Sequence, residues 1–170
     1  ARILMDQIRS EALNFLGVAE ESTYQEMEKH YPAAFKAYID KGIELDILNP
    51  ELKEFDLDRI ASAIDYTRDN QFTYLGLQTL YDRYFIHCDD VRYELPQVFF
   101  MRVSMGLALE EENREDRAIE FYKLLSSFDY MSSTPTLFNS GTKRPQLSSC
   151  YLTTIPDDLD GIFSAMKDNA

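Results

Sequence analysis

Apolar residues recur at intervals of three and four along most of the chain, from the first residues to about Tyr130. This spacing places apolar side chains on one face of an α-helix, where they can pack against a core. The interval is regular in the segments 31–43, 57–64, 72–85, 98–109 and 116–128. The sequence therefore predicts a mainly α-helical structure, with a helical domain over residues 21–130.

Local signals mark where individual elements start. Asp56 precedes an apolar helical segment and can cap its first turn, and Pro96 is suited to the first turn of the next long helix. The segment FIHCDDVRYEL (85–95) is an exception to the helical pattern. Its β-type residues flank Asp89 and Asp90, a pair that is compatible with a tight turn. A short β-hairpin is therefore predicted there.

The composition changes over residues 131–163, which are rich in Ser, Thr, Pro, Asn and Gly and lack helical periodicity. A run of this length with little regular structure is typical of a functional segment or a linker, and its large apolar side chains argue against a linker. Residues 150–155 (CYLTTI) are expected to form a strand, followed by a helix that is capped within 157–160. The side chains expected to be anchored in a core are Leu137, Phe138, Leu147, Tyr151 and Leu152.

The composition limits the classes of partner. The 170 residues carry a net charge of −13, which disfavours unassisted binding to nucleic acid or to an anionic membrane. The 11 Tyr and 11 Phe residues need burial, so they argue for a folded domain. No apolar run approaches the roughly 20 residues of a membrane span, and the first residues lack the apolar stretch of a signal peptide. A cytoplasmic location is therefore expected.

The two ends of the sequence suggest a piece of a longer polypeptide. The helical pattern begins at Ala1 without a starting Met or a capping residue. The helix-like segment 159–170 stops without a Gly or Pro terminator. We therefore expect a fragment.

The sequence contains two cysteines, Cys88 and Cys150, whose spacing fits neither a disulfide framework nor a zinc motif. Cys150 lies at the start of the expected strand, where a lone cysteine is more often a small core residue than a reactive one. The neighbours of Cys88, namely His87, Asp89 and Asp90, could suggest a metal site. A strand and its turn would direct them to different faces, so a structural role for Cys88 is favoured.

Other polar residues of the irregular stretch have simple structural interpretations. Thr134 and Ser149 can form local turn hydrogen bonds, which is the usual role of such residues. Asp157 can cap the helix that follows it. Lys143 and Arg144 form a basic pair, for which a solvated loop is favoured over phosphate binding.

The stretch 133–152, STPTLFNSGTKRPQLSSCYL, closely resembles the signature at the start of the catalytic barrel in ribonucleotide reductase large subunits. The resemblance extends upstream through 64–85 and 94–109, and downstream to DDLDGI (157–162). It implies a mainly α fragment with a short β-hairpin, leading into the first strands of an α/β ten-stranded barrel. The implied domains are the tail of an ATP-cone helix with a connection (1–20), the N-terminal helical domain (21–130) and the start of the catalytic barrel (131–170).

The resemblance implies an enzyme, a class I ribonucleoside-diphosphate reductase, which makes deoxyribonucleotides for DNA replication by a radical reaction. Cys150 matches one of two redox-active thiols that supply electrons to the substrate. A ribose 2′-hydroxyl leaves poorly unless a proton donor lies on its face of the sugar, and a thiol can give that proton before it joins a second cysteine in a disulfide. In the family the second cysteine and the radical-carrying cysteine lie much later in the chain, so Cys88 matches neither.

The resemblance also assigns ligand contacts. Thr134 matches a residue that contacts substrate phosphate, and Ser149 matches another substrate contact. Asp157, Asp158 and Leu159 match the segment that holds the allosteric specificity effector, a deoxynucleotide or ATP, where two large subunits meet. Several relatives are expected to have a small hydroxyl residue at the position of Asp158. No metal ligand is implied in this chain.

The implied partners follow from this chemistry. They are the rest of the large subunit, a second large subunit in a homodimer, a radical-generating small subunit that contains a metal, and thioredoxin or glutaredoxin as reductant. Nucleoside triphosphates act as effectors, and no cofactor is expected to bind this segment directly. Two alternatives stay open: an adenosylcobalamin-dependent ribonucleotide reductase, and a catalytically silent helical interaction module.

Overall fold

The computed structural model describes residues 1–169 and is mainly helical. Eight α-helices and two short 3-10 helices follow one another along these residues, with one β-hairpin between the fourth and fifth α-helices. The elements are α1 (Arg2–Phe15), α2 (Met27–Glu44), η1 (Pro50–Glu54), α3 (Leu57–Ser62), η2 (Tyr66–Gln71), α4 (Tyr74–Arg83), β1 (His87–Cys88), β2 (Val91–Arg92), α5 (Pro96–Leu107), α6 (Arg114–Ser126), α7 (Thr134–Asn139) and α8 (Leu159–Asp168). Within residues 1–169, no helix is both long and apolar enough to cross a membrane.

The predicted helix starts are confirmed. The Asp56 carboxylate accepts a hydrogen bond from the Arg59 backbone N–H at 3.0 Å, so it caps α3. Pro96 occupies the first turn of α5, where the missing N–H of proline is not needed. Thr73, which precedes α4, accepts from the backbone N–H of Gly76 in the same way.

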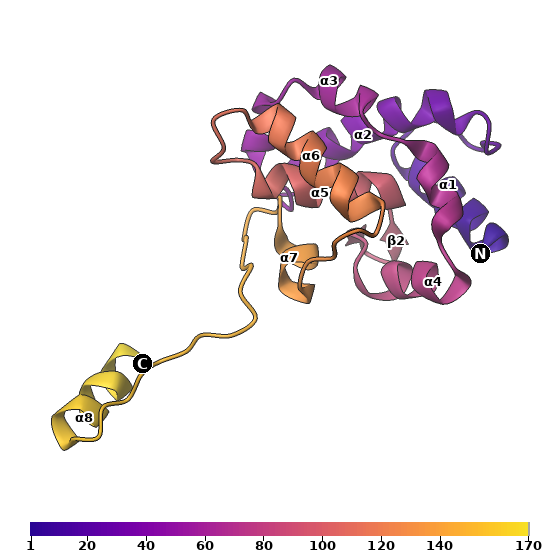
Figure 1. Ribbon diagram of the computed structural model, residues 1–170. Coiled ribbons are helices and arrows are strands. Elements are labelled where there is room, and N and C mark those ends of the chain that lie inside the picture. The colour runs from indigo at the N-terminus through magenta and orange to yellow at the C-terminus, as the bar shows by residue number, and fades with distance from the viewer. Residues whose placement is uncertain (170) are drawn as a thin grey trace.

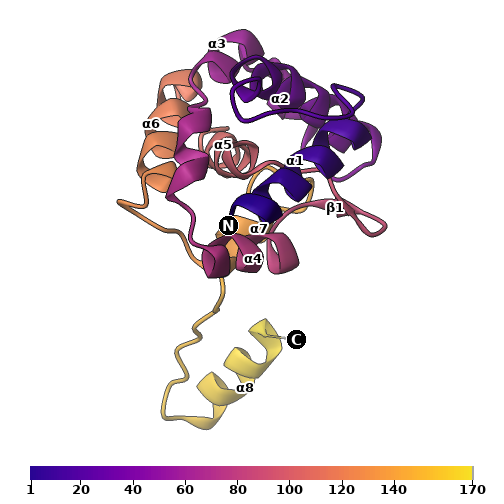
Figure 2. The same cartoon turned by 90° about the vertical axis from the view of Figure 1, so that its right-hand side faces the viewer.

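Helix α5 forms the centre of the helical body. Every residue from Pro96 to Met105 is buried, as expected for a helix that other elements surround. Figure 2 views α5 nearly end-on, with α1, α2, α3 and α6 around it. The opening helix α1 contributes Ile8 and Leu13 to the same core. The domain limits 1–20, 21–130 and 131–170 stay predictions, but α1 packs with the helices that follow it.

A buried polar cluster also joins α1 to the body. The Asp69 carboxylate, in η2, accepts hydrogen bonds from the Tyr31 hydroxyl at 2.9 Å, the Gln97 amide at 2.9 Å and the Arg9 guanidinium at 3.3 Å. Burial raises the pKa of Asp69 above its usual value, although these donors oppose the shift. These donors satisfy the buried Asp69 carboxylate, which would otherwise destabilise the core.

The predicted hairpin is confirmed. Strands β1 and β2 pair antiparallel, with His87 opposite Arg92 and Cys88 opposite Val91. Asp89, in the turn, has φ 51°, a left-handed conformation that aspartate tolerates better than most residues. Cys88 is half-buried and packs against the hydrophobic core, as a structural cysteine would.

The predicted strand over residues 150–155 is wrong. These residues belong to no strand and are exposed, and Figure 1 shows them within an extended chain that leads away from the body to α8. Tyr151 and Leu152 are 75% and 97% exposed, so their predicted anchoring in a core is also wrong. A strand needs hydrogen-bonding neighbours, and the described residues supply none at this place.

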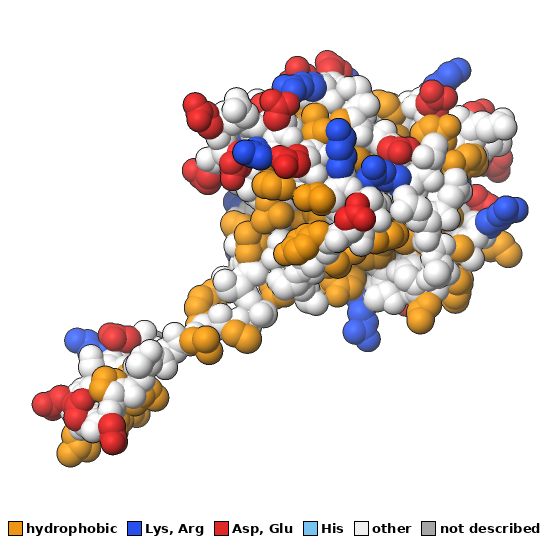
Figure 3. Space-filling view, in the orientation of Figure 1, with side chains coloured by type: hydrophobic (Ala, Val, Ile, Leu, Met, Phe, Trp, Pro, Cys, Tyr) orange, Lys and Arg blue, Asp and Glu red, His pale blue; other side chains and the backbone are white. Residues whose placement is uncertain are grey.

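The three other side chains expected to be anchored in a core differ in their burial. Leu137 is buried as predicted, Leu147 is half-buried, and Phe138 is 39% exposed. In Figure 3, apolar side chains gather where the extended chain leaves the body and continue along it to α8, while charged side chains cover the upper part of the body. On the face in view, apolar side chains are therefore exposed near the place from which residues 144–169 depart.

Candidate functional site

Helix α7 carries the first predicted site residue, Thr134. Pro135 lies in its first turn, where a proline favours helix initiation, and Ser133 precedes it in an extended conformation. Thr134 is exposed, and its Oγ1 lies 3.2 Å from the hydroxyl oxygen of Tyr84. Two residues later on the same helix, the Thr136 hydroxyl donates to the Leu147 carbonyl at 3.3 Å. The hydroxyl of Thr134 is thus available at the surface on a short, braced helix.

The guanidinium of Arg102 holds the other end of α7. Arg102 is fully buried in α5 and donates hydrogen bonds to the carbonyls of Ser140 at 2.7 Å, Leu137 at 3.1 Å and Phe138 at 3.3 Å. Carbonyls at a helix C-terminus lack partners within the helix, so an external donor is needed when they are buried. Arg102 therefore ties α7 to the central helix of the body.

Glu94 balances the buried charge of Arg102. Its carboxylate accepts from Arg102 Nε at 2.7 Å, from the Tyr38 hydroxyl at 2.6 Å and from the Ile86 backbone N–H at 3.0 Å. Burial disfavours the charged guanidinium, but the adjacent carboxylate outweighs it and raises the pKa of Arg102. Burial, and then the charge of Glu94, raises the pKa of Tyr38. Groups outside the pair therefore fix both residues: the Tyr38 hydroxyl and the Ile86 N–H hold Glu94, and the carbonyls of the α7 end hold Arg102.

Two glycines allow the chain after α7 to approach α5. A Cβ atom on Gly106 would lie 2.0 Å from the backbone nitrogen of Gly141, which no real contact permits. Gly141 itself has φ +77°, in the region that favours glycine. The Ser140 hydroxyl donates to the Val103 carbonyl at 2.7 Å, and the Asn49 N–H donates to the Gly141 carbonyl at 3.1 Å. The chain is therefore anchored closely at residues 140–141.

Sequence reasoning missed Arg102 and Glu94. The signal was present, because Arg102 is a charged residue within the apolar segment 98–109. A charge in such a place is seldom fully buried unless it is paired. The periodicity alone could not name its partners on α7, which lie more than thirty residues later in the chain.

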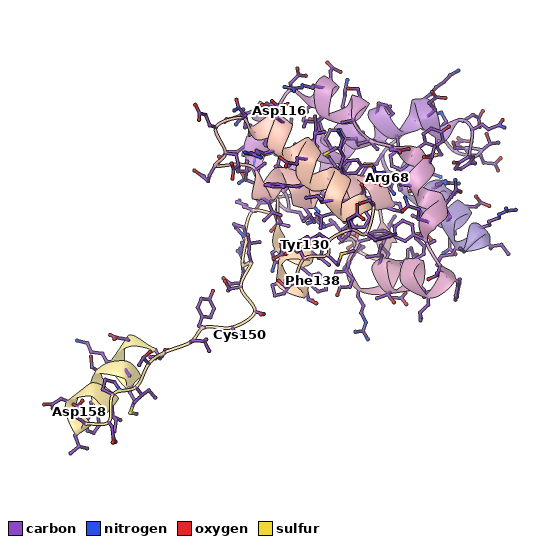
Figure 4. The ribbon with its side chains drawn as sticks, in the orientation of Figure 1. Arg68, Asp116, Tyr130, Phe138, Cys150 and Asp158 are labelled. Atoms are coloured by element: carbon purple, nitrogen blue, oxygen red, sulfur yellow. The ribbon has the colours of Figure 1, made fainter. Side chains whose placement is uncertain are left out.

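The predicted redox residue Cys150 lies beyond this anchored region. It is an exposed, free thiol, and Ser149 beside it is also exposed. Figure 4 shows Cys150 on the extended segment, between the body that carries Phe138 and the helix that begins near Asp158. The described residues therefore do not bring Cys150 and the α7 residues together into one closed pocket.

The predicted effector segment lies at the start of α8. Asp158 caps this helix, since its carboxylate accepts from the Gly161 backbone N–H at 2.8 Å. Asp157 and Leu159 are exposed, and so are Phe163 at 65% and Met166 at 62%. A helix cap within 157–160 is confirmed, but the capping residue is Asp158 and not Asp157. The helix presents apolar side chains to solvent.

The basic pair of the irregular stretch lies in a solvated loop. Lys143 pairs with Asp46 at the surface, and Arg144 is exposed. Both side chains are exposed, as expected for a solvated loop.

Comparison with known proteins places these features in a family. Residues 70–145, from η2 to the anchored loop after α7, match the model of the ribonucleotide reductase all-alpha domain. The chain is 51% identical over 171 residues to the ribonucleoside-diphosphate reductase subunit alpha of Chlamydia muridarum, covering 100% of this chain and 16% of that protein. It is 43% identical over 143 residues to the subunit alpha of Helicobacter pylori strain 26695, covering 84% of this chain and 18% of the relative.

A relative with lower sequence identity also matches most of this chain and a small part of its own length. The large subunit of ribonucleoside-diphosphate reductase from Plasmodium falciparum isolate Dd2 is 40% identical over 131 residues, covering 75% of this chain and 16% of that protein. The matches and the helical fold define an all-alpha reductase domain together with the chain that follows it. The chain belongs to the family of ribonucleotide reductase large subunits, and it spans less than a fifth of the length of these relatives.

Proposed function

We propose that this chain is part of a ribonucleoside-diphosphate reductase large subunit and supplies Cys150 as one of two reducing thiols. The observation that carries the proposal is an exposed, free thiol at Cys150, eleven residues after α7 ends at Asn139, within a chain that belongs to this family. Thr134 and Ser149 are the proposed substrate contacts, because they match substrate-binding positions of the family. Hydroxyl and N–H donors can bind phosphate without adding fixed charge.

The proposed chemistry uses the thiol twice. After a radical forms at the 3′ carbon of the ribose, the thiol of Cys150 gives a proton to the 2′-hydroxyl, which leaves as water. The resulting thiolate and a second thiol then form a disulfide, and the two electrons released reduce the substrate. The second thiol comes from the remainder of the large subunit, since Cys88 packs against the core of the helical body. Thioredoxin or glutaredoxin restores the two thiols.

The radical comes from a separate, metal-containing small subunit. The names of the relatives, subunit alpha and large subunit, support a multi-subunit enzyme over the adenosylcobalamin-dependent alternative. A catalytically silent helical module is the remaining alternative function. A reconstitution assay for deoxynucleotide formation distinguishes it from an enzyme.

The isolated chain should be catalytically inert and should regain activity when the rest of the large subunit and the small subunit are added. Only one of the three cysteines that the reaction requires lies here, and residues 144–169 lack neighbouring strands. Deoxynucleotide formation by the mixture tests the chemistry, and the Cys150→Ser chain provides the inactive control. Hydrogen exchange should show weak protection of residues 144–169 in the isolated chain and stronger protection after mixing. A stable complex that never makes deoxynucleotides would favour the silent module.

We also propose that residues 157–159 bind a nucleoside triphosphate effector where two large subunits meet. Substituting Asp157→Ala should weaken effector binding by roughly 1 to 3 kcal/mol, the usual cost of losing a hydrogen bond to a charged acceptor. Isothermal titration calorimetry on the assembled large subunit measures this, and basal reduction should change less. Asp160→Ala, in the first turn of the same helix, is the matched control. Equal dissociation constants for Asp157→Ala and wild type would leave Asp157 with no effector role.

A further inference from the structure

We propose that Tyr84 is a positioning residue that orients the hydroxyl of Thr134 toward substrate phosphate. This inference rests on the proposed function, which makes Thr134 a substrate contact. Its basis is the approach of the two hydroxyl oxygens to 3.2 Å across 50 residues of sequence. Tyr84 directly follows helix α4 in the body, as its C-cap residue, whereas Thr134 is the first residue of α7.

The ring of Tyr84 is held in place. Tyr84 is half-buried, and its backbone N–H donates to the Leu80 carbonyl at 2.9 Å at the end of α4. Its ring stacks on Phe138, with centroids 4.7 Å apart and an angle of 15° between the planes. Its ring also makes a T-shaped contact with Phe99, with a centroid distance of 6.4 Å and an angle of 70° between the planes. A ring fixed in this way orders its hydroxyl at little further cost in side-chain entropy.

Tyr84 contacts two points on one face of α7. Thr134 and Phe138 are four residues apart, so they are neighbours on the helix surface. The Phe138 contact sets the rotation of α7 against α4, and the Thr134 contact sets the direction of the hydroxyl. Arg102 holds the C-terminal carbonyls of the same helix from within the body. The helix is therefore fixed at both ends, and Tyr84 acts at the end where substrate would bind.

The direction of the hydrogen bond between Tyr84 and Thr134 determines whether Thr134 can donate to a substrate. A phenol is a stronger acid than an aliphatic alcohol, so Tyr84 is the better donor and the Thr134 oxygen is the better acceptor. A hydroxyl has one hydrogen, and accepting from Tyr84 leaves the hydrogen of Thr134 free to be donated. Accepting one hydrogen bond also strengthens the next donation along the chain. Thr134 is exposed, so an oxygen of a substrate phosphate can receive that hydrogen.

The test is Tyr84→Phe in the complete large subunit, assayed with its small subunit. The substitution removes one oxygen and keeps the ring that stacks on Phe138. We expect KM for the ribonucleoside diphosphate to rise about 2- to 10-fold, the factor expected for one neutral hydrogen bond. The kcat should stay within about twofold, because the contact acts in binding.

Tyr81→Phe is the matched control. Tyr81 lies one turn earlier on α4, and its hydroxyl donates to the Glu11 carboxylate at 2.8 Å, away from α7. Its loss should leave KM unchanged. Thr134→Val should raise KM at least as much as Tyr84→Phe, and the double variant should be no worse than Thr134→Val alone, because both changes remove one shared interaction.

The outcomes separate this inference from the proposed function. If Thr134→Val raises KM and Tyr84→Phe does not, Tyr84 has no positioning role and the substrate contact stands. If Thr134→Val leaves KM unchanged, the substrate contact fails and the inference fails with it. A fall in the unfolding temperature and in kcat together with the KM change for Tyr84→Phe would show a structural role and overturn the positioning role.

Discussion

Replacing Cys150 with serine should abolish multiple turnover of the assembled reductase. Serine is nearly isosteric with cysteine but cannot form a disulfide, so the two electrons needed for each catalytic cycle have no source. Cys150 is exposed and does not contribute to the core, and the fold should therefore be unaffected. Deoxynucleotide formation over many cycles, with thioredoxin or a small dithiol as reductant, measures the effect.

Cys88→Ser is the control for the same chemistry. Cys88 packs against the core and has no part in the proposed reaction, so its variant should retain turnover with at most a small loss of stability. Effector and substrate binding should be near normal in both variants. Sustained turnover by Cys150→Ser with a dithiol reductant would falsify the redox assignment.

Replacing Arg102 with methionine should destabilise the chain by about 3 to 5 kcal/mol, because it leaves the buried carboxylate of Glu94 without its partner. The substitution also removes the donors to the carbonyls of Leu137, Phe138 and Ser140. Since domains of this size are typically stable by about 5 to 15 kcal/mol, the variant should be marginal. Urea unfolding followed by circular dichroism measures the change.

Two further variants show whether the lost charge pair is the cause. Arg117→Met removes an exposed arginine, paired with Glu120 on the surface of α6, and should leave the unfolding midpoint nearly unchanged. The double variant Glu94→Gln with Arg102→Met carries no lone buried charge, and it should be more stable than Arg102→Met alone. Equal stability of Arg102→Met and wild type would contradict the role of this pair in holding α7.

The sequence by itself predicted most of the helical body. Intervals of three and four determine which side chains share a helix face, and caps such as Asp56 depend on hydrogen bonds to residues nearby in the sequence. The hairpin at Asp89 and Asp90 is similarly local. The family resemblance carried by 133–152 is confirmed by relatives that match across the chain. The roles of Thr134, Ser149, Cys150 and residues 157–159 came from that resemblance and stay predictions.

Only the tertiary structure decided how α7 is held and where the anchored chain ends. Arg102 and Tyr84 reach α7 across more than thirty residues of sequence, and no local pattern specifies such pairings. The same limit explains the wrong strand at 150–155, since its β-type residues are a local signal whereas a strand exists only when neighbours accept and donate its hydrogen bonds. Helices satisfy their backbone groups within one segment, so sequence determined them; sheet pairing and buried ion pairs join distant segments, so the fold decided them.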